Sequence, residues 1–417
     1  MLAFMGQPLV PHSGYRQDNI NSFNTKRTQG KIEDAAKLAE DLRALTDPNI
    51  GGPIQRALRY LGKIYYDRAL SRGFYGPEYA ETIADYEIAV RLDPNRIGAV
   101  YNLARFLTTC PVAKLRDGSK AVEAATRACE LTKWKNRVFV NSLAEAYYVA
   151  GDFASAAKWQ QEAINLLSEK EKTQWQRNYA ARLKLYQTDA AHSKGLSEGT
   201  FIAWWKLDEV KDGNIVDSSG NGLNGKLVGD ARIVSDPERG NVVSLDGNGD
   251  YVDCGDNPAF DIVGSITLSC WAKANKFDKD WQAIVSKGDT SWRLQRAADS
   301  NSIEFACTGA TTSDPDLSRW GSIYGKADAN DGRWHHIAGV YDGTKVHLYV
   351  DGKLDNSEEA AGLINTSDFS VLIGESAEEK ERFWNGLIDD VRIYSYALSP
   401  EEVRMLYEGK EPARKKE

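Results

Sequence analysis

The sequence predicts a multidomain α + β chain in which an α-helical N-terminal half is followed by an antiparallel β-sandwich. From residue 31 to about residue 186 the apolar residues recur at intervals of three and four, which is the period of an amphipathic helix. After residue 199 short alternating runs are separated by turns rich in glycine and asparagine, as in sandwiches and barrels. A length of 417 residues leaves room for two or three domains.

The change of pattern divides the chain into five segments. Residues 1–30 show no periodicity and are expected to form an extended or partly ordered arm. We then expect a helical domain over 31–188, a linker over 189–199, a sandwich over 200–409 and a charged tail over 410–417.

Composition and charge argue against several classes of partner. A formal net charge of -8 and a pI near 5.4 do not suit binding to phosphates, and the one dense basic run lies at residues 414–416. No run approaches the roughly 20 apolar residues that cross a bilayer. The N-terminus lacks the basic and apolar regions of a signal peptide. We expect no nucleic-acid partner and no membrane span.

The cysteines are too few and too scattered for a disulfide framework, and no pair of them has zinc-ligand spacing. We expect buried free thiols. A bridge between the first two or between the next two stays open if the protein is exported; the five residues are Cys110, Cys129, Cys254, Cys270 and Cys307.

An internal repeat organises the helical half. Small residues stand at equivalent positions of three predicted first helices, at Gly62, Ala104 and Ala144, which are 42 and 40 residues apart (104−62, 144−104). The predicted second helices carry alanine at the matching places, Ala89, Ala128 and Ala163. This pattern resembles the tetratricopeptide repeat family, whose unit is a helix–turn–helix of 34 residues. Further helices near 31–45 and 170–186 would cover the open ends of such a solenoid.

The resemblance implies a concave groove that is lined by the first helix of each pair. Asparagine and arginine in such a groove can hold a peptide backbone or a carboxylate, so a protein partner is expected there. The same positions also suit ordinary solvent-facing helix residues, because the repeat determines the fold far better than the partner. The candidate groove residues are Asn102, Arg105, Asn141 and Glu145.

The second half carries ordered strand and turn motifs. The motifs include WKLDE at 205–209, LDGNGDYV at 245–252, GRWHHIA at 332–338, LYVDG at 348–352 and GLIDDVRIY at 386–394. In order and spacing they resemble the laminin-G-like, concanavalin A-like lectin/glucanase jelly roll of bacterial envelope and extracellular proteins. The resemblance implies two antiparallel sheets that bind a ligand, commonly a glycan. It also favours an extracytoplasmic location, although the chain shows no signal peptide.

Related domains often hold a structural calcium near the last strand. The resemblance places Asp389, the first aspartate of the IDDVR motif, as the first side-chain ligand, with Asp246 as its neighbour. Calcium takes six to eight oxygen ligands, so main-chain carbonyls and water would complete the shell. An alternative is that Asp389 bonds a loop without any metal.

Sugar binding needs aromatic platforms and planar hydrogen-bonding groups. Alternation along residues 291–296 places Trp292 and Leu294 toward the core, so Arg293 and Gln295 would face the concave or solvent side. Three further tryptophans stand in predicted loops or strand edges, where a ring is less readily explained as packing; they are Trp281, Trp320 and Trp384. Most tryptophans are nevertheless core residues.

The sequence argues against catalysis. Retaining glucanases of this fold carry clustered acids on one strand, and no strand here has that pattern. The nearest acids, at 208–209 and at 378–379, are adjacent and would point to opposite faces of a strand. We therefore expect a non-catalytic binding or scaffold protein. The alternatives are a structural subunit of a surface assembly without a sugar ligand and, third, an unusual glycoside hydrolase.

Overall fold

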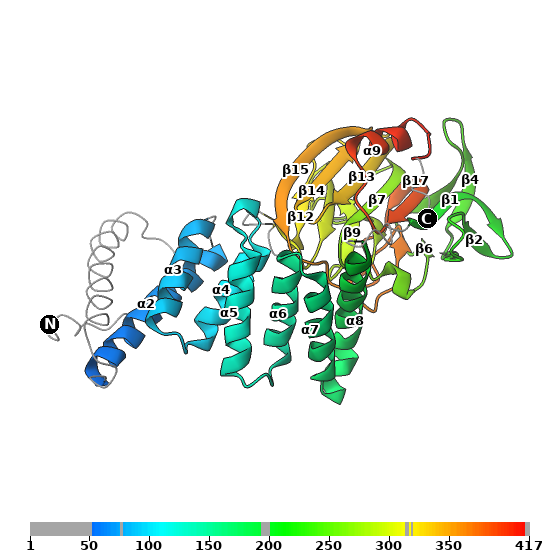
Figure 1. Cartoon of the computed structure of the whole chain (residues 1–417). Helices are drawn as coiled ribbons and strands as arrows, with labels where there is room; N and C mark the ends of the chain where they lie inside the picture. The colour runs from blue at the N-terminus through cyan, green and yellow to red at the C-terminus, as the bar shows by residue number, and fades with distance from the viewer. Residues whose placement is uncertain (1–51, 76–77, 193–200, 313–316, 318–319, 413–417) are drawn as a thin grey trace, which may run out of the picture.

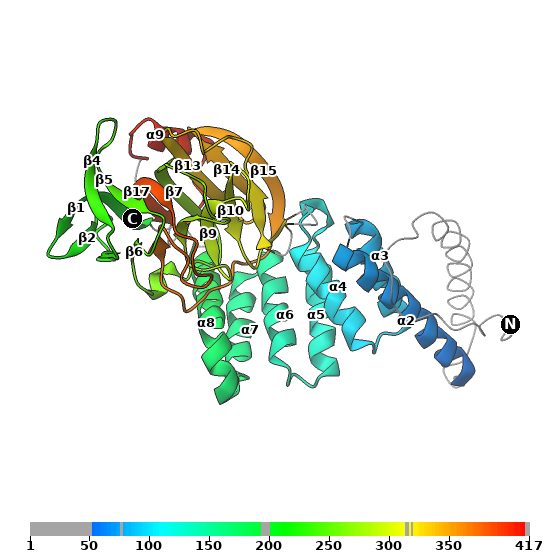
Figure 2. The same ribbon diagram turned by 180° about the vertical axis from the view of Figure 1, so that it is seen from behind.

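The computed structural model describes residues 52–75, 78–192, 201–312, 317 and 320–412. Consecutive helices lie side by side in a row, and the β-sandwich sits against one end of the later helices (Figures 1 and 2). The fold is therefore the predicted one, a helical half followed by antiparallel sheets. The predicted arm over 1–30 and the predicted helix near 31–45 lie outside the described residues.

The helical half is built around small buried residues. The alanines predicted at the helix crossings are at most 1% exposed, and a Cβ on Gly62 would meet Asp93 at 3.1 Å. Such close approach lets the helices pack in pairs. The helices are α2 (Gly52–Tyr75), α3 (Tyr79–Leu92), α4 (Ile97–Thr109), η2 (Ala113–Leu115), α5 (Gly118–Leu131), α6 (Arg137–Val149), α7 (Phe153–Asn165) and α8 (Glu169–His192). Among them no helix is both long and apolar enough to span a bilayer.

The first sheet of the sandwich has the order β11-β15-β14-β13-β7-β17-β1-β2, and β5 pairs with both β17 and β4. All its pairs are antiparallel. Its strands are β1 (Phe201–Lys211), β2 (Asn214–Asp217), β4 (Arg232–Asp236), β5 (Gly240–Asp246), β7 (Ile266–Ala274), β11 (Thr311–Thr312), β13 (His335–Tyr341), β14 (Lys345–Val350), β15 (Lys353–Ala361) and β17 (Asn385–Tyr394).

The second sheet has the order β12-β10-β9-β8-β16-β6-β3 and is also antiparallel. The two sheets enclose one large core, into which Gly339 of β13 admits the ring of Phe305; a Cβ on that glycine would lie 2.3 Å from the ring. The remaining elements are β3 (Lys226–Val228), β6 (Tyr251–Asp253), β8 (Ala283–Ser286), β9 (Trp292–Arg296), β10 (Ile303–Cys307), β12 (Ser322–Tyr324), β16 (Leu372–Ile373), η3 (Pro258–Phe260) and α9 (Pro400–Tyr407). All five cysteines are buried free thiols, as expected.

The two halves meet in a polar joint. Arg177 of α8 forms ion pairs with Asp261 at 2.7 Å, with Asp368 at 3.2 Å and with Asp256. The fully buried Lys287 of the sandwich binds Asp256 at 2.8 Å. Hydrogen bonding to these carboxylates, first of all to Asp256, raises the pKa of Arg177, so its charge is secure at any working pH. The joint therefore fixes α8 on the sandwich through opposed charges.

Apolar and backbone contacts complete the joint. Leu363 of the sandwich packs on the cluster around Tyr186 in the helical half, and the Thr311 hydroxyl donates to the Thr109 carbonyl at 3.0 Å. A Cβ on Gly264 would lie 2.9 Å from Leu185, so the backbone of the β6–β7 loop touches α8 directly.

Candidate functional site

The outer face of β9 and β10 brings together most of the sugar-contact residues predicted from the sequence. Strand alternation places Trp292 and Leu294 in the core, both fully buried, and directs Arg293 and Gln295 to the opposite face. That face is covered, however, because Arg293 is 3% exposed and Gln295 is 1% exposed. The orientation follows the alternation, but the two side chains are not open to solvent.

Glu304 of β10 organises this face. Register pairs it with Gln295 across the two strands, and its carboxylate accepts hydrogen bonds from Gln295 Nε2 and Ser322 Oγ. Arg293 Nη2 lies 3.4 Å from the same carboxylate, so a buried cation meets a buried anion. Arg293, Gln295, Glu304 and Ser322 are all at most 3% exposed, so the network is closed to solvent.

Two tryptophans flank the network at its edge. Arg293 lies over the Trp320 ring with 6.0 Å to the centroid, and Arg382 lies over the Trp281 ring at 5.8 Å. Arg382 also binds Asp289 at 2.7 Å. Trp281 has a left-handed backbone with φ of 59°, which is unusual for a bulky residue and is concentrated at functional positions in proteins. Both rings are partly exposed. We define Trp281, Trp320, Arg293 and Arg382 as the aromatic rim.

Trp384 does not join the aromatic rim. Its side chain is 1% exposed and lies in the core between the sheets, edge-on to Phe277 with 5.6 Å between ring centroids. The sequence places it just before β17, and packing of a large apolar ring accounts for it.

The expected calcium pair is also separated. Asp389 is buried and accepts from Arg239 Nε at 2.6 Å, while the Arg239 guanidinium stacks on Trp271 at 4.1 Å. Burial raises the pKa of Asp389 to about 6. With its charge matched by an arginine, Asp389 does not fit a calcium shell.

A different set of carboxylates suits a cation better. Oxygens of Asp230, Asp246 and Asp250 lie within 4.8 Å of one another. Asp250 is 1% exposed, and its Oδ1 is buried without a hydrogen bond from any described residue, while Oδ2 accepts from the Asp246 amide at 2.8 Å. Carboxylate oxygens are the ligands that calcium prefers. Lys279 Nζ binds the nearby Gly247 carbonyl at 2.7 Å and supplies some positive charge.

The four predicted groove residues of the helical half do not form one open surface. Asn102 donates to Tyr86 at 3.4 Å, and Asn141 donates to Glu145 at 2.8 Å. Glu145 is in turn ion-paired with the buried Arg182 of α8. Arg105 is exposed, and its side chain makes no hydrogen bond or ion pair with the described residues. Asn102 and Glu145 therefore serve contacts between helices, and Asn141 bonds Glu145 within α6.

Comparison with known proteins finds a family match in the second half. Residues 246–404 match the family model of the concanavalin A-like lectin/glucanases superfamily. An α-L-arabinofuranosidase of Bifidobacterium longum is 28% identical over 214 residues, which cover 48% of this chain and 20% of that protein. The chain thus spans about one fifth of this curated relative.

Two solved structures illustrate the likeness of the sandwich to other chains. One is domain 4 of AbnA, an extracellular arabinanase of Geobacillus stearothermophilus in complex with arabinotriose, at 20% identity and a TM-score of 0.40, covering 51% of this chain and all of that one. The other is the binding domain of Paraclostridial Mosquitocidal Protein 1, at 17% identity and a TM-score of 0.40, covering 50% and 52%.

Proposed function

We propose that the chain is a non-catalytic binding protein whose sandwich recognises a glycan or glycoprotein at the aromatic rim. The carrying observation is the aromatic rim itself, two partly exposed tryptophans that each stand beside an arginine. Aromatic faces stack on the C–H faces of sugars, and Arg382, whose side chain is 16% exposed, can supply planar donors for hydroxyls. The match of residues 246–404 to a lectin and glucanase superfamily supports this class of ligand.

A glycan array tests the proposal directly. The full chain, the Trp281→Ala and Trp320→Ala variants and a control variant, Trp175→Ala, would be applied at equal concentration. Trp175 is a partly exposed tryptophan of α8 that lies outside the aromatic rim. We expect the rim variants to lose binding by about tenfold or more per ring, by analogy with nucleic-acid bases, whose stacking on one aromatic ring contributes on the order of 1–3 kcal/mol. Binding that survives both rim variants, or no binding of the full chain to any glycan, would overturn it.

The proposal includes a structural calcium at Asp230, Asp246 and Asp250. A bound cation would give the buried Oδ1 of Asp250 the partner that the described residues do not supply. Thermal unfolding with calcium and with chelator tests this, and Asp250→Asn is the decisive variant. Calcium should raise the melting temperature of the parent chain and leave the variant unchanged; equal shifts would refute the assignment.

A second candidate function is a structural subunit that binds proteins and no sugar. One observation favours it: Arg293 and Gln295 are almost fully buried and already bonded to Glu304, so they are not available to a ligand. In either case we propose that the helical half holds a protein partner, with Arg105 as the exposed member of the predicted groove. The glycan array described above distinguishes the two functions, because only the first predicts sugar binding. Mass spectrometry of co-purified proteins, with the parent chain and Arg105→Ala compared, tests the protein partner of the helical half.

A further inference from the structure

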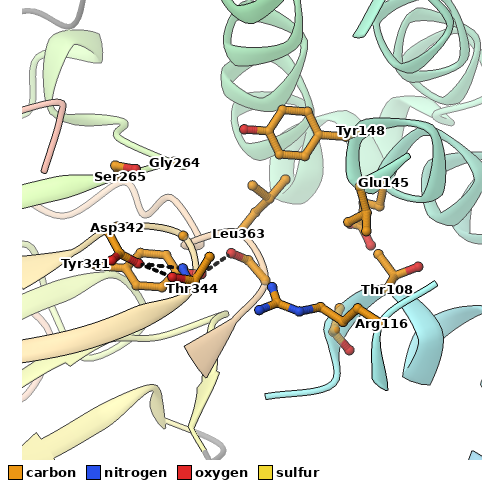
Figure 3. Close-up of a pocket in the computed structure, with 14 residues that line it drawn as sticks. Thr108, Arg116, Glu145, Tyr148, Gly264, Ser265, Tyr341, Asp342, Thr344 and Leu363 are labelled. Carbon is orange, nitrogen blue, oxygen red and sulfur yellow. Dashed lines mark hydrogen bonds between the residues drawn. The ribbon is translucent and has the colours of Figure 1, made fainter. Parts of the chain in front are cut away.

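A cavity of about 260 Å³ lies between the helical half and the sandwich (Figure 3). The helical half contributes the α4–α5 connection and the end of α6. The sandwich contributes the β13–β14 hairpin and the loops before β7 and after β15. Neither half forms the cavity alone. Its volume is below the roughly 300–1,000 Å³ typical of pockets for drug-sized ligands, which limits an occupant to about one small ring.

Arg116 is the notable side chain of this cavity. Figure 3 shows it reaching from the α4–α5 connection toward the β13–β14 hairpin. Its guanidinium makes no hydrogen bond and no ion pair with the residues that the structure describes. Arginine is always ionised at physiological pH, so a positive charge faces the cavity without a protein counter-charge.

The two carboxylates that line the cavity are already engaged elsewhere. Glu145 is paired with Arg182 and accepts from Asn141. Asp342 accepts from the Thr344 amide and hydroxyl and from the Lys345 amide, each at 2.7 Å. Although burial raises the pKa of Asp342, hydrogen bonds from His347 and from these groups outweigh it and lower that pKa. In this cavity the Arg116 guanidinium remains available to a ligand, whereas the Glu145 and Asp342 carboxylates are occupied by other protein groups.

Hydroxyl-bearing residues also line the cavity. The Thr108 and Thr109 hydroxyls donate to backbone carbonyls one turn earlier, at 2.7 and 2.9 Å. These hydroxyl hydrogens are therefore already used, and the two oxygens can act only as acceptors. The Ser265 hydroxyl forms no hydrogen bond with the described residues and can donate or accept. A ligand that suits this lining has a carboxylate for Arg116 and hydroxyls for the side-chain oxygens.

We propose that this interdomain cavity binds a small hydroxylated carboxylate of the sugar-acid class, with Arg116 as the residue that holds the carboxylate. The ligand contacts both halves at once. The site is separate from the aromatic rim, so it does not depend on the function proposed above.

Isothermal titration calorimetry on the full chain tests the proposal with D-glucuronate as the probe. D-Glucose is the neutral counterpart of the same ring size, and acetate is the carboxylate without hydroxyls. We expect glucuronate to bind more tightly than either, and Arg116→Ala to weaken it by about 10- to 100-fold, the range for a lost hydrogen bond to a charged group. Arg116 supports no other described side chain, so the variant should fold normally.

Two control variants make the outcomes decisive. Arg127→Ala removes an exposed arginine of the same half that pairs with Glu130 outside the cavity, and it should bind glucuronate like the parent chain. Trp281→Ala should do the same, which separates this site from the aromatic rim. Absence of glucuronate binding, equal binding of acetate or glucose, or equal weakening by the Arg116 and Arg127 variants would each overturn the proposal.

Discussion

The β9–β10 face and the interdomain cavity each contain an arginine and at least one carboxylate, but only the first pairs them. On the β9–β10 face Arg293 is 3% exposed and meets Glu304, and that carboxylate is also bonded by Gln295 and Ser322. In the cavity Arg116 faces carboxylates that are held by other groups. Burying an unpaired charge is costly, so a fold supplies partners wherever it closes over one. On the β9–β10 face the arginine charge is matched by the fold, whereas in the cavity it is left available.

The largest test of this contrast is Glu304→Ala, which removes the shared acceptor from a closed network. Breaking a buried ion pair on one side typically costs about 3–5 kcal/mol, because the remaining charge is left without a partner. We expect the free energy of unfolding in urea to fall by about that amount. Glu304→Gln keeps the shape and one acceptor, and should cost less. A loss below about 1 kcal/mol, the scale of an exposed pair, would contradict the assignment of this face as a closed network.

The pH dependence of the unfolding free energy tests a second buried charged group, Asp389. Burial first of all raises its pKa to about 6, although Arg239 lowers it and Asp390 and Asp208 add to the rise. The folded protein therefore binds this proton more tightly than the unfolded chain. The resulting stability is fully present below about pH 4 and is lost as the pH rises through about 6, on the order of 2–3 kcal/mol.

Asp389→Asn is the matched control for this titration. The asparagine of this variant cannot ionise. Between about pH 4 and pH 7 the parent chain should therefore lose stability relative to the variant. A difference that stays constant over this range would show that Asp389 titrates at its ordinary pKa.

Arg177→Ala tests the joint between the halves, where closure is partial. The Arg177 side chain is 24% exposed and two of its three acids are partly exposed, so we expect a smaller loss of about 1–2 kcal/mol. Hydrogen exchange should rise in the β6–β7 loop and the C-terminal part of α8. Unchanged exchange there would mean that Leu363 and Gly264 hold the halves together without the charges.

Arg116→Ala should have the smallest effect on stability. Because its guanidinium has no partner among the described residues, its removal should change the unfolding free energy by less than about 0.5 kcal/mol. A loss as large as that of Arg177→Ala would show that Arg116 supports the fold, and the contrast between closed and available charges would fail.

Local patterns in the sequence predict the directions of these side chains, and distant parts of the chain determine their partners. Alternation in 292–296 correctly separates Trp292 and Leu294 from Arg293 and Gln295. It does not reveal Glu304 as their partner, because that depends on the pairing register of β9 with β10. Likewise the IDDVR motif identifies Asp389 as a special position, but its partner Arg239 is 150 residues away in sequence.

The cavity is still harder to foresee. Its lining comes from the helical half and from several loops of the sandwich, and no motif links them. Of the candidate residues predicted from the sequence, Glu145 lines the cavity. It was predicted as a groove residue, and in the structure it also pairs with Arg182. The helical periodicity and the buried alanines are consistent with the resemblance to tetratricopeptide repeats, which stays a prediction.

The joint at Arg177 has a consequence for how the two halves act together. A flexible linker would let each half sample many orientations, and a partner bound to one half would rarely meet the other. With α8 held on the sandwich, any surface on the helical half keeps a constant distance and angle to the aromatic rim. A partner that carries matching groups at that spacing meets the second site at a high effective concentration once the first is engaged. The chain can therefore select partners by the distance between two binding groups, each of which binds only weakly by itself.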